Sequence, residues 1–240
     1  MKQSSKILLV SVAGILVVVV AMVITARTMV GNIISGTSRE SGRIELSGTR
    51  TSEEFAIEGF ERVVTEGAWQ VEIIQDDAYG VSITADEEVL PELIVEERAG
   101  SLFLDMPGNL PLGGLDVRAE VRMPTLDRIE TKGGADVSLV DFDLDTLRIQ
   151  TEGAVNVEGE DSTIDMLYLE VAGASNVDFR NSNIVNAELA VEGAGNVSLN
   201  MAGGRLNGYL GGVGQISYSG EISQESVEVR GLGSVERRGN

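Results

Sequence analysis

Three carboxylates alternate with apolar residues at Asp141, Asp143 and Asp145. Closely spaced aspartate oxygens are ligands that Ca²⁺ accepts in protein loops. However, no glycine stands at the position where such a loop turns sharply. A strand edge with Phe142 and Leu144 buried and the aspartates solvated explains the same alternation. The sequence therefore predicts no metal site, and these three aspartates are the one candidate for calcium.

Acidic pairs that could serve glycoside hydrolysis occur at Asp76–Asp77, Asp86–Glu88 and Glu96–Glu97. One carboxyl of such a pair needs an apolar pocket that raises its pKa, and nothing in the sequence supplies one. The chain has no His and no Cys, which removes the commonest general base, the thiol nucleophile and the zinc-thiolate site. We therefore expect no catalytic residue, no cofactor and a protein that is not an enzyme.

A polar residue recurs at the fourth place of a repeated motif, glycine–small–x–polar–Val/Ile. The polar residues are Asp136, Asn156, Asn176, Asn196, Gln215 and Ser234. Amide side chains stacked at strand spacing can hydrogen-bond along the stack, and Asn also tolerates the backbone of a corner. We interpret these residues as a structural ladder. The alternative is a binding strip for an extended polymer, and the sequence leaves open whether the column faces inward or outward.

The motif defines a repeat that must position this column. Its leading glycines follow one another at spacings of 20, 20, 20, 19 and 19 residues. Within a unit, apolar residues alternate with polar ones, so that Leu167, Leu169 and Gly173 are expected to face inward. After the first 19-residue step the inward positions change parity, to Leu210 and Ile216, which keeps them aligned in space.

A repeat of this length is typical of an architecture in which each unit buries its apolar face against its neighbours. Leucine-rich repeats have a similar period, but no helix pattern lies between the strand segments here. The alternation therefore predicts an all-β fold, a parallel β-helix (solenoid) of about 20-residue coils stacked ~4.8 Å apart.

The repeats become less regular toward the N-terminus. Residues 126–240 are the regular part, and residues 55–125 form an irregular β entry part that contains all four prolines. Val63–Val71 aligns with Ile149–Val157 and is expected to be a first, distant copy of the unit. Residues 27–54 are rich in Gly, Ser and Thr, which predicts a flexible stalk.

An uncharged apolar run occupies residues 7–26. At ~1.5 Å per residue a helix of this length spans a bilayer. Lys2 and Lys6 lie before it, which favours a cytoplasmic segment 1–6 and a C-terminal domain outside. We expect a retained transmembrane anchor; a cleaved signal peptide is the alternative, although the apolar run is longer than such peptides usually have.

The chain carries a formal net charge of −20. Such a surface repels nucleic acid, so no nucleic-acid partner is expected. The last repeat is followed at once by Glu236, Arg237 and Arg238, and we expect these charges to blunt the open end of the stack.

Several segments resemble the auto-transporter adhesin head GIN domain family of bacterial envelope proteins. The resemblance covers roughly residues 55 to 238 and rests on Phe60–Val63, Gly67–Ile73, Ala85–Glu87, Met123–Leu126 and the repeated Gly-Ala-x-Asn-Val. It implies a right-handed parallel β-helix, export and no assigned catalytic residues. No translocator barrel follows the repeats in this sequence, so the resemblance does not imply self-secretion.

Together these features predict a single-pass protein of the bacterial cytoplasmic membrane that displays a β-solenoid outside the cytoplasm. Its expected function is non-catalytic binding, adhesion or envelope interaction. Besides the membrane at residues 7–26, the expected partner is a cell-surface or envelope polymer or protein. The alternatives are a carbohydrate-active β-helix enzyme and a structural or sensory envelope component. The sequence does not indicate an oligomeric state.

Overall fold

The computed structural model describes residues 46–108, 110 and 115–239, which form an all-β unit with one short 3₁₀ helix, η1 (Leu90–Glu92). None of the helical structure in this described part is long and apolar enough to cross a bilayer, and the anchor expected at 7–26 lies outside it. The strands are β1 (Arg50–Phe55), β2 (Arg62–Gln75), β3 (Gly80–Asp86), β4 (Ile94–Arg98), β5 (Ser101–Asp105), β6 (Arg118–Met123), β7 (Arg128–Val140), β8 (Asp143–Ala202), β9 (Arg205–Leu210), β10 (Val213–Glu221), β11 (Gln224–Val229) and β12 (Leu232–Arg237).

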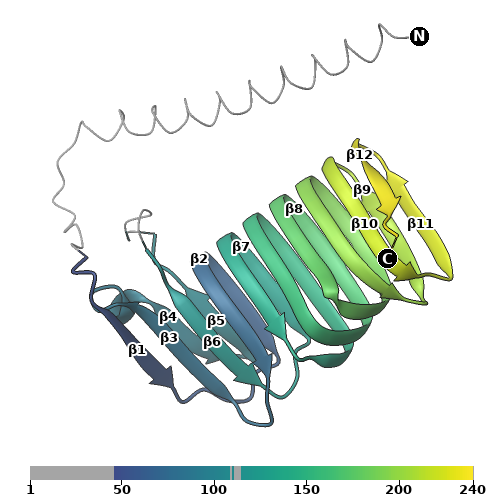
Figure 1. Ribbon diagram of the computed structural model, residues 1–240. Helices are drawn as coiled ribbons and strands as arrows, with labels where there is room; N and C mark the ends of the chain where they lie inside the picture. The colour runs from purple at the N-terminus through teal and green to yellow at the C-terminus, as the bar shows by residue number, and fades with distance from the viewer. Residues whose placement is uncertain (1–45, 109, 111–114, 240) are drawn as a thin grey trace, which may run out of the picture. The chain divides into compact units, whose positions relative to one another are not determined.

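β2 and the chain from β7 onward wind into coils that pair in parallel, each with the next (Figure 1). Gly133 of β7 pairs with Gly153 of β8, an offset of 20 residues. Asn196 of β8 pairs with Gln215 of β10, an offset of 19. Parallel stacking and the change of offset are therefore confirmed. The distant first copy is confirmed as well, because Val63 pairs with Ile129, which in turn pairs with Ile149.

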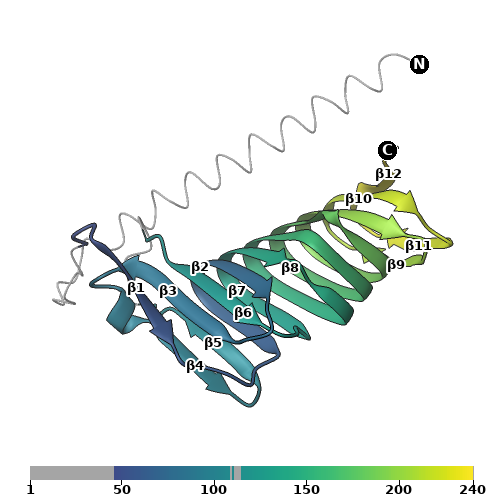
Figure 2. The same cartoon turned by 60° about the horizontal axis from the view of Figure 1, so that its bottom comes forward.

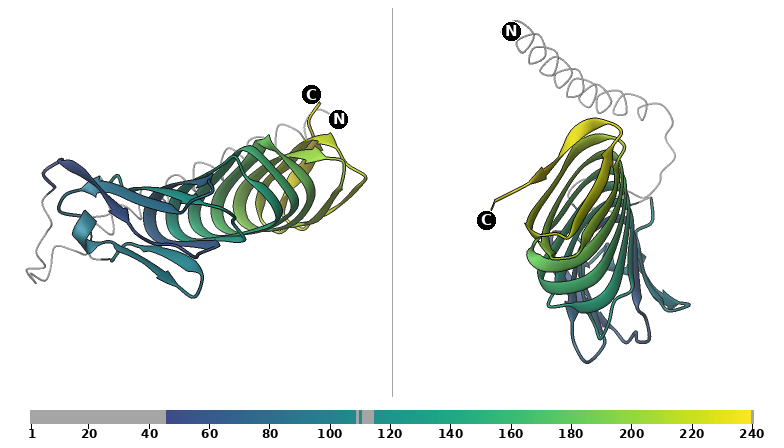
Figure 3. Two further views of the ribbon diagram at one scale, coloured as in Figure 1. Left: turned by 90° about the horizontal axis from the view of Figure 1, so that it is seen from below. Right: turned by 90° about the vertical axis from the view of Figure 1, so that its right-hand side faces the viewer.

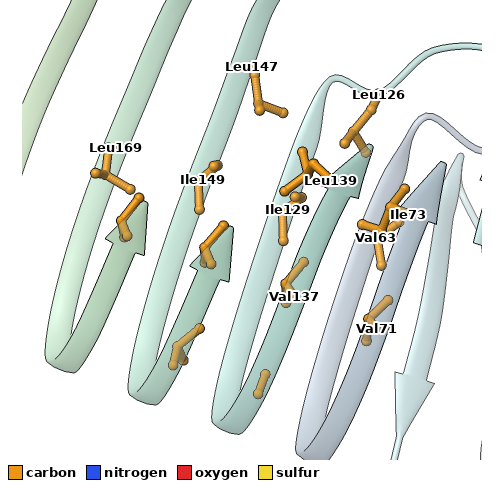
Figure 4. Close-up of a cluster of buried hydrophobic side chains, with 14 of the residues drawn as sticks. Val63, Val71, Ile73, Leu126, Ile129, Val137, Leu139, Leu147, Ile149 and Leu169 are labelled. Carbon is orange, nitrogen blue, oxygen red and sulfur yellow. The ribbon is translucent and has the colours of Figure 1, made fainter. Parts of the chain in front are cut away.

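The hydrophobic core runs through the inside of the coils as rows of stacked side chains (Figure 4). One row contains Val63, Ile129, Ile149 and Leu169, and all of them are almost completely buried. Each such residue contributes about 1.5–3 kcal/mol through its removal from water. The period-two alternation forms this core because every second side chain of a strand points to the same face.

The motif glycines break the alternation, and our expectation that they face inward is wrong. Gly173 and Gly193 are exposed and have a φ of +111°. This backbone conformation turns the strand through a corner, so that the side chains of Ala174 and Ala194 also face outward. The residues that follow them are buried again. The corner could not be recognised from the sequence pattern, because glycine has no side chain whose polarity would show whether the position faces inward or outward.

Antiparallel strands cover the N-terminal end of the stack (Figure 2). β1 pairs antiparallel with β3, β3 with β6, and β4 with β5. β1 falls within the segment expected to be a flexible stalk, so that residues 50–54 belong to the sheet. Trp69 of β2 is buried in the core, and its ring N–H donates a hydrogen bond to the carbonyl oxygen of Glu66 at 3.0 Å.

A row of buried threonines gives a prediction about stability. Thr65, Thr131 and Thr151 occupy paired positions in β2, β7 and β8. The Thr151 hydroxyl lies 3.1 Å from that of Ser175, whereas the Thr131 hydroxyl has no hydrogen-bond partner among the described residues. A buried hydroxyl without a partner is destabilising. We expect Thr131→Val to raise the free energy of unfolding by ~1 kcal/mol in chemical denaturation.

The matched control for this prediction is Thr151→Val, which removes a hydroxyl that has a partner. It should lower the free energy of unfolding, because Ser175 is then left with an unpaired buried hydroxyl. Equal effects of the two substitutions would contradict the prediction.

Candidate functional site: two polar outer faces

The predicted ladder residues lie on the outside of the coils, directly after the glycine corner. We call this surface the asparagine face. It consists of the six predicted residues, Asp136, Asn156, Asn176, Asn196, Gln215 and Ser234, and of Gln70, which the register adds to the column. Register pairs join Gln70 to Asp136, Asp136 to Asn156, Asn196 to Gln215 and Gln215 to Ser234. All of these side chains are exposed or half-exposed, which answers the question that the sequence left open.

Hydrogen bonds on the asparagine face run both along the column and sideways. The Asn176 side-chain amide donates to Asn156 Oδ1 at 2.9 Å, as a ladder requires. Asn156 itself donates to Glu158 at 3.1 Å, and the Ser234 hydroxyl donates to Glu236 at 3.2 Å, both two residues along the same strand. The ladder role therefore stays a prediction that the Asn176–Asn156 bond supports.

The ladder predicts that two asparagines contribute differently to the free energy of unfolding. Asn176→Ala removes the amide that reaches Asn156, and we expect it to lower the free energy of unfolding by ~0.5–1.5 kcal/mol, the net contribution of one hydrogen bond. Asn196→Ala is the control, because no side-chain hydrogen bond joins Asn196 to another described residue. Chemical denaturation followed by circular dichroism measures both. If neither substitution changed the free energy of unfolding, the asparagine column would have no structural role, and a role in recognition would be favoured.

A second polar surface lies on the other side of the glycine corner, across consecutive coils of β7, β8 and β9. It contains an open groove of about 480 Å³, which we call the tyrosine groove. Its charged, amide and aromatic lining consists of Glu130, Lys132, Gln150, Glu152, Glu170, Glu192 and Tyr209. Pairing places Glu130 beside Gln150 and Lys132 beside Glu152, so these side chains form columns like those of the asparagine face.

The groove is organised by contacts between neighbouring coils. The Tyr209 hydroxyl donates to Glu192 Oε1 at 2.7 Å, and this hydrogen bond raises the pKa of Tyr209. The Arg230 guanidinium lies 4.7 Å from the centre of the Tyr209 ring. Gln150 donates from its side-chain amide to Glu170 at 2.7 Å. These contacts hold the aromatic ring and the amide in place, and several carboxylates remain exposed around them.

The chemistry of the tyrosine groove is that of hydrogen bonding. The carboxylates accept hydrogen bonds from hydroxyl or amine groups, and the amide of Gln150 can both donate and accept. The Tyr209 ring offers an apolar contact surface. Lys132 is the only lysine among the described residues, so that acidic groups dominate the lining. Such a groove repels polyanions and suits a neutral or amine-bearing ligand.

Four carboxyl groups of the described residues have a clearly shifted pKa. The clear shifts of carboxyl pKa values in the described residues are all downward. Hydrogen bonds from Arg118, Arg180 and Arg230 lower the pKa values of Asp116, Asp178 and Glu228, and one from Ser47 lowers that of Glu88. A general acid requires the opposite shift.

The calcium candidates Asp141, Asp143 and Asp145 lie along one coil. Phe142 and Leu144 between them are buried and the three aspartates are exposed, in the alternation of a strand edge. Asp141 has a φ of +64° and occupies a corner. In the described part of the chain, no three acidic residues converge in an arrangement that could hold a metal ion.

The sequence analysis did not identify the tyrosine groove, although the signal was present. Glu130, Gln150 and Glu170 follow one another at the 20-residue spacing, as do Lys132 and Glu152. These columns were missed because their residue types change from coil to coil, whereas the Asn column repeats one type. The alignment of positions, and not of residue types, would have found the groove.

The coils and the two open faces define a β-solenoid-like protein without an enclosed active site in its described part. A family profile with the description "Putative auto-transporter adhesin, head GIN domain" matches residues 59–221. The chain belongs to this family, as its motifs suggested. A comparison with curated proteins finds no match.

Two solved structures share this fold. One, described as a putative adhesin from Bacteroides fragilis, has a TM-score of 0.64 and 18% identity, and the match covers 81% of this chain and 100% of that one. Another, described as a putative lipid binding protein from Parabacteroides distasonis, has a TM-score of 0.51 and 19% identity, with 82% and 99% covered. At these identities the similarity shows the fold alone.

Proposed function

We propose that this protein is a non-catalytic binding or adhesion module that recognises an extended, neutral or amine-bearing polymer of the cell surface or envelope. The tyrosine groove is the observation that supports this function. It is open, runs across consecutive coils and presents carboxylates, an amide and the ring of Tyr209. The adhesin description of the family and of the Bacteroides relative agrees with this proposal.

The shape and lining of the groove favour a hydrated polymer over an acyl chain. Hydrogen-bonding groups line it on successive coils, so a ligand with repeating polar groups can contact each coil in turn. The description of the Parabacteroides relative names lipid binding, but the groove here has Glu152, Glu170 and Glu192 along it. Carboxylates without a cationic partner disfavour the burial of a hydrocarbon chain beside them.

Binding assays on residues 44–240 test this function. These residues form a compact unit with its own core, and the Bacteroides structure consists of this fold alone. The ligands are a panel of neutral, amine-bearing and anionic glycans together with envelope fractions, with and without calcium. We expect saturable binding to neutral or amine-bearing polymers and none to anionic ones.

Variants on the two faces locate the site. Tyr209→Ala is expected to weaken binding at least about tenfold, because aromatic anchors dominate recognition energies. Asn176→Ala, on the asparagine face, is the control and should bind as the unchanged protein does. The opposite pattern would move the site to the asparagine face, and breakdown of a glycan would show an enzyme instead.

We further infer that the coils are right-handed and that residues 7–26 form a single-pass anchor which holds the domain outside the cytoplasmic membrane. The uncharged run of 20 residues and the preceding Lys2 and Lys6 support the anchor. Membrane fractionation of the full chain after alkaline washing tests it. Retention in the membrane and protease accessibility of the domain from outside are expected. Release of a shortened chain would favour a cleaved signal peptide.

A further inference from the structure

The large hydrophobic side chains that the described residues expose are concentrated at the C-terminal end of the stack. Leu232 is 76% exposed, Val213 56% and Val229 40%. Leu232 and Val213 are paired neighbours in β12 and β10, and Val229 ends β11, shortly before β12 begins. Leu232 and Val213 continue the outward column of Ala194, and together with Val229 they give this end of the stack exposed apolar surface, which indicates an interaction surface.

Val229 is exposed because the hydrophobic core continues to this end of the stack. In the row of inward positions that contains Val191, Leu210 and Val229, the first two are 0% exposed, and Val229 is 40% exposed. Val191 and Leu210 each lie between two neighbouring coils, whereas Val229 has a neighbouring coil on one side only. In the described part of the chain no strand pairs with the far edge of β11 or β12 (Figure 3). A stack of repeats requires a cover at such an end.

Both ends of the stack have strand edges without a partner among the described residues, and they differ in the side chains that these edges carry. At the N-terminal end, β1 lies at the edge of the sheet and its residues are mostly charged or polar and exposed. Behind it the core residues Ile83 and Leu104 are 0% exposed. At the C-terminal end, Glu236 and Arg237 occupy only the last part of β12, so the charges do not blunt its first half, where Leu232 lies.

Charge favours a second copy of the chain as the partner. Residues 224–238 contain three acidic residues and three arginines, which makes this coil neutral. The net charge of −20 therefore lies elsewhere in the chain, so that two copies can approach through this end without a net repulsion between the two coils. Because the end carries both signs, a two-fold arrangement can also place an arginine of one copy beside a glutamate of the other.

We propose that the C-terminal end of the stack binds the same end of a second copy, in a two-fold symmetric dimer. β12 of one copy pairs edge to edge and antiparallel with β12 of the other, and the exposed apolar residues of β11 and β12 cover each other. Antiparallel pairing follows from the two-fold axis, since it reverses the strand direction. The contact is closed, because a two-fold axis uses the same surface of both copies.

Sedimentation velocity on residues 44–240 over a range of concentrations tests the dimer. We expect a reversible monomer–dimer equilibrium that Leu232→Arg weakens at least about tenfold. Leu232 is largely exposed, so this substitution leaves the coils folded, which circular dichroism checks. Ile94→Arg is the matched control at the opposite end, where Ile94 is 39% exposed, and it should leave the equilibrium unchanged.

Cross-linking gives a second, independent measurement. The chain has no Cys, so a single introduced cysteine reports on one position. Ser234→Cys in β12 is expected to form a covalent dimer under mild oxidation, whereas Thr51→Cys in β1 should not. A protein that stays monomeric at all concentrations, a dimer that tolerates Leu232→Arg, or cross-linking through Thr51→Cys in preference to Ser234→Cys would overturn the proposal.

Discussion

Gly153→Ala is expected to lower the free energy of unfolding by about 3 kcal/mol or more, enough to prevent folding of a marginally stable domain. Gly153 has a φ of +119°, which side-chain-bearing residues rarely adopt. A Cβ at this position would also lie well under 3.0 Å from the carbonyl oxygen of Gly133 in the preceding coil. Backbone strain and the clash act together, and neither is relieved by a side-chain rotation, since both involve the main chain.

Gly134→Ala is the control for this substitution. Gly134 lies beside the corner, has no atom within 4 Å of the place that a Cβ would occupy, and pairs with Ala154 of the next coil. The substitution should be neutral or stabilise by ~0.4–1 kcal/mol, because alanine restricts the unfolded chain more than glycine does. Chemical denaturation of both variants measures the difference. Similar losses in the two would show that chain entropy, and not the corner, determines the effect.

Phe179→Ala should cost about 3–5 kcal/mol of the free energy of unfolding. Phe179 is 0% exposed, and its ring fills the space above Gly159 of the preceding coil. A Cβ on Gly159 would collide with this ring, so that the glycine serves as the complement of the phenylalanine. On its own, Gly159→Ala is therefore expected to cost ~1–3 kcal/mol through overpacking.

The double variant distinguishes this complementarity from two independent effects. Once the ring is absent, Gly159→Ala should cost almost nothing, which gives a coupling energy of ~1–3 kcal/mol. The matched pair is Gly159→Ala with Ile83→Ala, since Ile83 is equally buried but lies in β3, several strands away. Those two costs should add. Additivity in both pairs would disprove the proposed fit between Gly159 and Phe179.

The regular coils were predictable because apolar and polar residues alternate along their strands. Residues such as Leu167 and Leu169 mark one face by side-chain type, and the 19-residue step shifted the parity as stacking requires. The N-terminal strands were less predictable. The antiparallel pairing of β1 with β3 joins segments that are distant in the sequence, and the exposed β1 has no apolar alternation that would reveal it.

The candidate site was predicted in part. The sequence placed the asparagines in one column but did not determine on which side of the coil, because that depends on the corner at residues such as Gly173. The tyrosine groove depends on side chains of different types in successive coils, such as Lys132 beside Glu152. Their proximity arises from the register, which motif matching does not use.

The stacking of coils also determines how the domain responds to a mechanical load. Backbone hydrogen bonds between coils run along the stack, so a pull on its two ends stretches one interface after another. The first coil to detach would release its 20 residues as extended chain, about 66–72 Å at ~3.3–3.6 Å per residue, while the remaining coils stay intact. A protein built in this way lengthens in steps under tension, and each step dissipates energy before the next interface opens.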